Sequence, residues 1–322
     1  MYIALGVFFL VLGVTGLLVK AKRASLEANK PSSTWNVRSI DTMKYSRDLA
    51  REKATDEKFA TTINEMVEDI ANTGATHVAV GTPYSAEFVP YLTLWVDAAR
   101  RNDINVWFRG NIPGWEGWFE YAKIDREEHK ELLKAFLLKN PQLFENGDIF
   151  SPCPECENGG SGDPRFTGDV EGFRQFLIDE TELASEIFAE QNVSVMANYH
   201  SMNGDVAKLV MDPKTTKTLG GVVVVDHYVA SADQLVLDVA EYAEMSEGKI
   251  ILGEFGAPIP DLHGKMTESE QAAWIADALE KLGNEKSLIG INYWVNSGGT
   301  TALWKENGSA REAVEVLSQY YE

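Results

Sequence analysis

From residue 35 onward, the sequence alternates short apolar runs with longer segments in which apolar residues recur at helical spacing. Runs of Ile, Leu and Val bounded by glycine or polar residues are typical of strands that are buried on both faces, as in a parallel sheet. The apolar runs predict eight strands: Val37–Ile40, His77–Val80, Asn105–Arg109, Asp148–Ser151, Val193–Ala197, Gly221–Val225, Ile250–Gly253 and Ile289–Trp294.

The amphipathic segments between these runs predict the helices of repeated βα units. They are Asp56–Ala71, Ala86–Arg101, Arg126–Leu137, Glu171–Glu190, Ala232–Met245 and Glu268–Leu282, with a short helix near Gly204–Met211 and a last helix at Ala310–Tyr321. Eight strands that are each followed by a helix favour a closed (β/α)8 barrel, the TIM barrel, over an open doubly wound sheet. We therefore expect residues 35–322 to form one α/β barrel domain. Nucleotide binding has no support, because no glycine-rich phosphate-binding motif follows the first strand.

Composition narrows the range of partners. Of the 322 residues, 44% are hydrophobic and 24% are charged, which is ordinary for a folded globular protein. The formal net charge of −20 argues against a nucleic acid or another anionic polymer as partner. A neutral substrate is compatible with this charge.

The run Ile250–Gly253 leads directly into Glu254. A carboxylate at the end of a buried strand is poorly placed for packing. It is well placed for chemistry, because the active site of a (β/α)8 barrel lies at the carboxyl ends of its strands. Glu254 is therefore the first candidate catalytic residue, and a strand-end ion pair is the alternative.

A second carboxylate follows the fourth predicted strand, in the stretch Pro154-Glu155-Cys156-Glu157-Asn158. Residues after strands 4 and 7 lie nearly opposite each other across an eight-stranded barrel. Hydrolysis of a glycosidic bond needs such a pair, because one group protonates the leaving oxygen while the other attacks or activates water. Glu155 is the candidate acid, and Glu157 is the alternative.

Other strand ends carry residues that packing alone would not select. Arg109, His227 and Tyr228 can donate hydrogen bonds that keep Glu254 ionised while the other carboxyl stays protonated. Each of these three could instead have a structural role. Asn111 and the loop that follows it, with Trp115, Trp118, Phe119 and Tyr121, suit contacts to a sugar, since aromatic faces stack on sugar rings. Burial of the tryptophans against the barrel rim is the alternative.

These residues resemble the clan A glycoside hydrolases, which are retaining enzymes with a (β/α)8 fold. Gly253-Glu254-Phe255-Gly256 resembles the strand that carries the nucleophile, and Asp226-His227-Tyr228 and Tyr293-Trp294 resemble the ends of strands 6 and 8. The resemblance implies that Glu254 is the nucleophile, that the acid/base follows strand 4, and that Trp294 lies under the substrate.

The chain departs from the clan pattern at strand 4, where Pro154 stands in place of the usual Asn before the acid/base. This departure leaves Glu155 and Glu157 both open as the acid/base. It also removes an Asn that usually contacts the sugar 2-hydroxyl, for which Asn158 is a possible substitute.

The leading hypothesis is a retaining glycoside hydrolase that cleaves O-glycosidic bonds of a neutral, β-linked oligo- or polysaccharide. It needs no cofactor and no metal. The alternative is a catalytically silent TIM barrel that binds a glycan or a partner protein at the cell surface. We expect a monomer.

The chain has two cysteines, Cys153 and Cys156, which flank the candidate acid. One C-x-x-C pair is a weak signal for zinc, because a structural zinc site takes four ligands. A thioredoxin-type pair belongs at the start of a helix in a small βαβ fold. A local disulfide or two free thiols that shape the loop remain as interpretations.

Residues 2–19 form an uncharged stretch, and its length is close to the shortest that crosses a bilayer. We therefore predict an uncleaved membrane anchor at residues 1–19 and a polar tether at residues 20–34. The basic residues Lys20, Lys22 and Arg23 favour a cytoplasmic domain. A saccharide substrate favours the other side, and we expect the catalytic domain to be extracytoplasmic.

Overall fold

The computed structural model describes residues 35–159 and 162–322. The predicted anchor and tether lie outside these residues, so the membrane anchor and the side of the membrane remain predictions. Within the described part of the chain, no helix has the length and apolar character needed to cross a bilayer.

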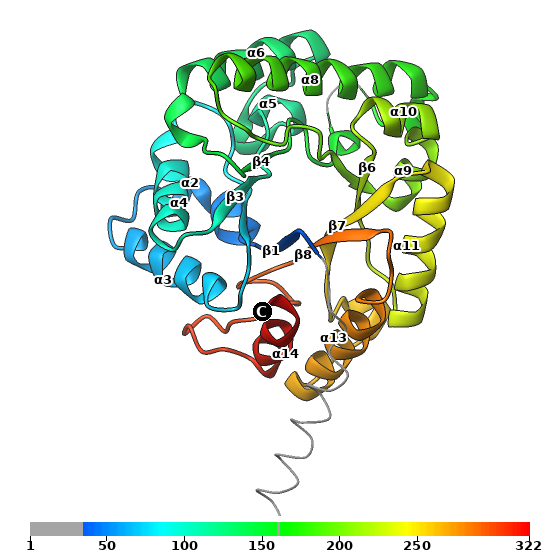
Figure 1. The fold of residues 1–322 in the computed structure, drawn as a ribbon. Coiled ribbons are helices and arrows are strands. Elements are labelled where there is room, and N and C mark those ends of the chain that lie inside the picture. The colour runs from blue at the N-terminus through cyan, green and yellow to red at the C-terminus, as the bar shows by residue number, and fades with distance from the viewer. Residues whose placement is uncertain (1–34, 160–161) are drawn as a thin grey trace, which may run out of the picture. The chain divides into compact units, whose positions relative to one another are not determined.

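Eight parallel strands form the centre of the molecule, and helices surround them (Figure 1). The strands are β1 (Val37–Asp41), β2 (His77–Val80), β3 (Asn105–Phe108), β4 (Ile149–Phe150), β5 (Ser201–Asn203), β6 (Val222–Asp226), β7 (Lys249–Phe255) and β8 (Leu288–Tyr293). Their order in the sheet is β4-β3-β2-β1-β8-β7-β6-β5, with β1 paired to both β2 and β8. This arrangement of consecutive parallel neighbours fits the predicted TIM barrel.

The longer helices lie close to the predicted ranges, except for residues 213–218, which form a short helix that the sequence did not predict. They are α3 (Phe59–Ala71), α4 (Val89–Arg101), α6 (Arg126–Lys139), α8 (Val170–Glu190), α9 (Gly204–Val210), α10 (Pro213–Thr218), α11 (Ala232–Ser246), α13 (Glu268–Leu282) and α14 (Glu312–Tyr321). Short helical turns are α2 (Ala50–Lys53), α5 (Pro113–Glu116), α7 (Pro164–Thr167) and α12 (Pro260–His263). Several helices begin at a side-chain cap, such as the capping box of Thr267 and Glu270 at α13.

The fifth predicted strand, Val193–Ala197, is wrong in its position. Only Met196 forms a bridge, with Ile149 of β4, while the strand that pairs with β6 begins at Ser201. Residues 197–200, between these two points, belong to no strand, and Asn198 there donates from Nδ2 to the carbonyl of Leu219 at 2.8 Å. The backbone bond from Phe150 N to Met196 O, at 2.8 Å, still joins β4 to this segment.

The interior of the barrel is layered. Six strands each contribute one residue to a buried apolar cluster, whose members are Val37, Ala79, Trp107, Ile149, Val224 and Ile251, together with Tyr199. Because alternate residues of a strand face the same side, Arg109 and Asp226 lie one step further along the same faces as Trp107 and Val224. A polar layer therefore sits on the apolar one, at the carboxyl ends of the strands.

Candidate active site

Glu254 reaches the interior through an irregularity in β7. Ile251 belongs to the interior cluster, so simple alternation would turn Gly253 inward and Glu254 outward. The register between β6 and β7 shifts here, and Asp226 pairs with Glu254 instead of Gly253. Bulges of this kind re-aim side chains, often next to active sites. The shift brings the Glu254 carboxyl into the polar layer.

Arg109 is the centre of that layer and has no exposed surface. Its Nη1 lies 2.8 Å from Asp41 Oδ2 and 3.1 Å from Glu254 Oε1. Its Nη2 lies 3.1 Å from both Asp226 Oδ2 and Ser201 Oγ. One guanidinium thus holds carboxylates from β1, β6 and β7 in fixed positions.

Glu254 has a second donor on its other oxygen. The hydroxyl of Tyr228 donates to Glu254 Oε2 at 2.8 Å. The Tyr228 ring meets the partly buried Trp294 edge to face, with ring centroids 6.1 Å apart. Trp294 and Tyr228 therefore form an aromatic wall beside the carboxyl.

Glu155 faces this group from the loop after β4. One carboxyl oxygen from each of Glu155, Asp226 and Glu254 lies within 4.8 Å of the other two. Glu157, by contrast, is bound to Asn203. The backbone N and the Nδ2 of Asn203 donate to Glu157 Oε1 at 2.7 and 2.9 Å. Of the two candidate acids, Glu155 is the one that this cluster contains.

Burial has the largest effect on the pKa of each of these carboxyls. It raises the pKa of Glu254 to about 7, against the opposing effect of the Arg109 guanidinium. Burial also raises the pKa of Glu155, again opposed by Arg109. The pKa of Asp226 is raised well above its usual range, first by burial and further by the neighbouring Glu254 and Glu155. All three shifts favour retention of a proton by this group, as a general acid requires.

The same three carboxyls are close enough together to share a divalent cation. Arg109 already supplies a positive charge to two of them, Asp226 and Glu254. The Arg109 guanidinium is therefore already the cation that pairs with these carboxylates, and we assign no metal to the cluster.

Arg109 contacts Glu254 as the sequence predicted, while two predicted sugar contacts, Trp115 and Asn111, are fully buried. Arg109 is buried among carboxylates and positions Glu254. Trp115 has no exposed surface, so its ring offers no face to a sugar; it stacks on Phe176 at 5.1 Å. Asn111 is also fully buried, and its Oδ1 accepts from the backbone of Ile112 at 2.7 Å. The prediction that Trp115 and Asn111 contact a sugar directly is corrected accordingly.

His227 also differs from the prediction. Its Nε2 lies 2.7 Å from Asp238 Oδ2 on α11, so the ring is directed towards that helix and away from Glu254. Only its backbone contributes at the strand end, where His227 N donates to the Glu254 carbonyl at 2.8 Å. Of the pair His227-Tyr228, Tyr228 is the side chain beside the candidate nucleophile.

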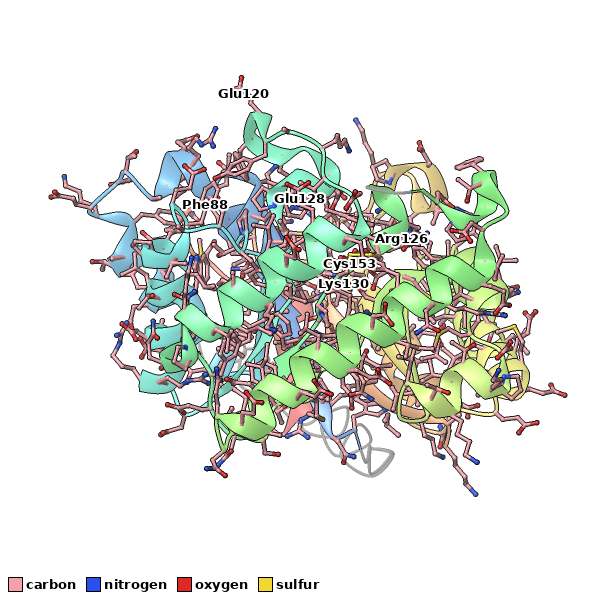
Figure 2. All side chains as sticks on the ribbon, turned by 90° about the horizontal axis from the view of Figure 1, so that it is seen from above. Phe88, Glu120, Arg126, Glu128, Lys130 and Cys153 are labelled. Atoms are coloured by element: carbon pink, nitrogen blue, oxygen red, sulfur yellow. A yellow bond between two sulfur atoms is a disulfide. The ribbon has the colours of Figure 1, made fainter. Side chains whose placement is uncertain are left out.

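Of two other predicted contacts, Asn158 lies beside the carboxyl pair and Trp118 contacts Arg47. Asn158 is exposed and hydrogen-bonds the Glu155 carboxylate through its side chain, which opposes the raised pKa of that group. Trp118 is partly buried, and the Arg47 guanidinium lies 4.9 Å from the centre of its ring. The loop that carries Trp118 projects from the barrel, with Glu120 at its tip (Figure 2).

The sequence assigned no role to Asp41, Asp226 or Glu116. Asp41 and Asp226 end β1 and β6, and strand-end position was the one signal that could have identified them. Burial raises the pKa of Glu116 to about 7, and Glu155 is among the charges that act on it. Glu116 belongs to the short turn α5, for which the apolar pattern contains no signal.

No protein-family model and no curated protein matches the chain. Solved structures do match. A GH5_18 protein from Bifidobacterium longum, in complex with Manβ1-4GlcNAc, has a TM-score of 0.67 and 13% identity over 88% of this chain and 77% of its own. A GH5_18 protein from Streptomyces cattleya, with the same disaccharide, has a TM-score of 0.64 and 13% identity. The match covers 88% of this chain and 80% of the Streptomyces protein.

A β-glucuronidase from Bifidobacterium dentium, complexed with coumarin-3-O-glucuronide, matches with a TM-score of 0.61 and 16% identity. The match covers 89% of this chain but 46% of the glucuronidase. At these identities the similarity concerns the fold. The resemblance to the clan A glycoside hydrolases is confirmed at that level.

Proposed function

We propose that the protein is a retaining glycoside hydrolase for β-linked sugars, with Glu254 as nucleophile and Glu155 as acid/base. The observation that carries this proposal is the proximity of the two carboxyls, whose oxygens lie within 4.8 Å of each other. Retaining glycosidases have carboxyl groups about 5–5.5 Å apart, while inverting enzymes separate them by about 6.5–9.5 Å to leave room for water.

In the first step, Glu254 attacks the anomeric carbon while protonated Glu155 gives its proton to the leaving oxygen. Arg109 and Tyr228 donate to the two oxygens of Glu254 and favour its charged form. In the second step, ionised Glu155 takes a proton from water, which attacks the glycosyl-enzyme. The water oxygen forms a bond to the anomeric carbon as the bond from that carbon to Glu254 breaks, so the cycle ends with Glu155 protonated and Glu254 ionised.

The choice of substrate follows from charge and from the structural neighbours. Glu155, Asp226, Glu254 and Asp41 surround a single guanidinium, so an anionic sugar ring at this point would meet repulsion. A neutral sugar avoids that cost. The GH5_18 structures hold Manβ1-4GlcNAc, which makes a β-mannoside the first substrate to test. The silent-barrel alternative loses its main support, because Glu155 does reach Glu254 despite the departure at Pro154.

Mechanism-based labelling tests this proposal. The purified domain is incubated with 2,4-dinitrophenyl 2-deoxy-2-fluoro glycosides of mannose, glucose and glucuronic acid, and its peptides are mapped by mass spectrometry. An adduct on Glu254 with a neutral sugar is expected, and the Glu254→Gln variant is the control that should remain unlabelled. An adduct on another residue, or hydrolysis with inversion at the anomeric carbon, contradicts the proposal.

A further inference from the structure

The two cysteines enclose Glu155 in a covalent ring. Cys153 and Cys156 form a disulfide with Cα atoms 5.2 Å apart, and both residues are buried. Inside the ring, Glu155 has φ 45° and ψ 46°, in the left-handed region. A residue with a Cβ is disfavoured there and remains only where its surroundings hold it. The disulfide is the covalent part of those surroundings.

Buried side chains tie both ends of the ring to the segment after β3. Asn111 Nδ2 donates to Cys153 Sγ at 3.6 Å, and Trp115 Nε1 donates to the Cys156 carbonyl at 3.0 Å. Asn111 is held in turn by His129 of α6, whose Nε2 lies 2.7 Å from its Oδ1. The ring is therefore fixed to the barrel wall at both ends.

A third tie fixes the ring to the opposite side of the loop. The backbone N of Glu155 donates to the carbonyl of Ser201 at 2.7 Å. Ser201 begins β5, and its hydroxyl accepts from Arg109, the same guanidinium that holds Glu254. One short path of contacts thus joins the ring to the candidate nucleophile.

We propose that the Cys153–Cys156 disulfide is a positioning element that holds the Glu155 carboxyl beside Glu254. The inference rests on the proposed function, in which Glu155 is the acid/base. Without the disulfide, Glu155 leaves the left-handed conformation and its carboxyl moves away from the leaving oxygen, while Glu254 keeps Arg109 and Tyr228. Asn111 and Trp115 then serve as anchors of the ring.

Leaving-group dependence separates positioning from a general effect on folding. Dinitrophenolate departs without a proton, whereas phenolate needs one, so loss of the acid affects only the second substrate. In Cys153→Ser/Cys156→Ser, we expect kcat/KM for phenyl β-D-mannopyranoside to fall about 100-fold or more, as for loss of a general acid. For 2,4-dinitrophenyl β-D-mannopyranoside it should stay within about threefold of wild type. Pro154→Ala, which keeps the disulfide, is the matched control. It should leave the ratio of the kcat/KM values for the two substrates unchanged.

Equal losses on both substrates, or no loss on either, overturn the proposal. If the double variant does not fold, the disulfide is reduced in the folded wild-type protein with a water-soluble phosphine, and the thiols are counted. The phosphine becomes its oxide with oxygen from water, and the two sulfurs take up two electrons and two protons. The same selective loss on the phenyl substrate is expected, and equal rates for reduced and oxidised protein count against the proposal.

A crystal structure of the double variant gives a readout that needs no substrate. We expect Glu155 outside the left-handed region, with its carboxyl beyond 4.8 Å from that of Glu254. An unchanged Glu155 overturns the positioning role even if no β-glycoside is hydrolysed. The proposed function fails separately, when the wild-type protein neither hydrolyses nor becomes labelled at Glu254.

Discussion

The hydroxyl of Tyr228 donates to Glu254 Oε2 at 2.8 Å, on the side of the carboxyl opposite Arg109. This bond favours the ionised form of Glu254 and lowers its pKa against the effect of burial. The Tyr228 pKa is raised well above its usual range, first by burial, so the phenol stays a donor. The pair therefore keeps a buried carboxyl available as a nucleophile.

Removal of the Tyr228 hydroxyl should shift the pH dependence of kcat/KM. In Tyr228→Phe, the pKa of Glu254 rises, so less of it is ionised at a given pH and the acidic limb of kcat/KM moves to higher pH. A bond to a charged group contributes about 1.5–3 kcal/mol, so we expect kcat/KM at neutral pH to fall about tenfold or more. Kinetics on a β-mannoside between pH 4 and 8 measure both effects. Tyr242→Phe, on α11, is the control, and an unmoved acidic limb in Tyr228→Phe contradicts the prediction.

Arg109 should matter more for stability than other arginines. It is fully buried among Asp41, Asp226 and Glu254, and its removal leaves buried carboxylates without a counter-charge. Loss of one partner of a buried ion pair costs about 3–5 kcal/mol, so Arg109→Met should lower the free energy of unfolding by that amount. Urea denaturation at neutral pH measures it. Arg51→Ala removes an exposed pair with Glu87 and should cost under about 1 kcal/mol; similar losses in the two variants argue against the prediction.

Stability should fall as the pH rises between about 4.5 and about 7. Burial raises the pKa of Glu254 to about 7, from a usual value of 4.5. The folded protein thus binds this proton more tightly than the unfolded chain does, and the resulting stability is present below pH 4.5 and lost as the pH passes through 7. Unfolding free energies of wild type and Glu254→Gln across this range measure the effect. The difference between them should change by on the order of 3 kcal/mol, and parallel curves would refute the linkage.

The two tryptophans Trp115 and Trp294 should give opposite phenotypes. Trp115 is fully buried against Phe176, so Trp115→Ala should destabilise the fold by about 3–5 kcal/mol. Trp294 is partly exposed beside Tyr228, so Trp294→Ala should chiefly raise KM for the glycoside. Thermal unfolding together with steady-state kinetics distinguishes them. A stable Trp115→Ala with raised KM would restore the original assignment of that ring to a sugar subsite.

The apolar runs were sufficient to predict the barrel because each buried strand and its following helix is a local pattern. The position of β5 was not predicted, since the irregular segment after Met196 depends on contacts with residues distant in sequence, such as that of Asn198 with Leu219. Glu254 was found as a strand-end residue. The bulge that turns it inward is invisible in the apolar run, where simple alternation would face Gly253 inward.

Side-chain direction in loops was the weakest part of the prediction. His227 and Tyr228 are adjacent, yet His227 turns to Asp238 on α11 and Tyr228 to Glu254, a choice made by the partners that the fold supplies. Trp115 is buried because α8 brings Phe176 against it. Residue type alone therefore named aromatic and polar candidates, but it could not show which of them face the site.

The choice between Glu155 and Glu157 can be settled by chemical rescue. Glu155→Ala should reduce hydrolysis of phenyl β-mannoside by about 10²–10⁴-fold, because leaving-group protonation and water activation are both lost. Azide needs no general base, so it should restore turnover of the dinitrophenyl substrate and yield a β-glycosyl azide with retained configuration. Glu157→Gln is the matched control. Its carboxyl accepts from Asn203 and lies outside the carboxyl cluster, so we expect neither the loss nor the rescue. Rescue in Glu157→Gln instead would transfer the acid/base role to Glu157. The α-glycosyl azide from Glu155→Ala would contradict the acid/base role of Glu155, because a single displacement by azide indicates that the variant has lost its nucleophile or the base of an inverting enzyme.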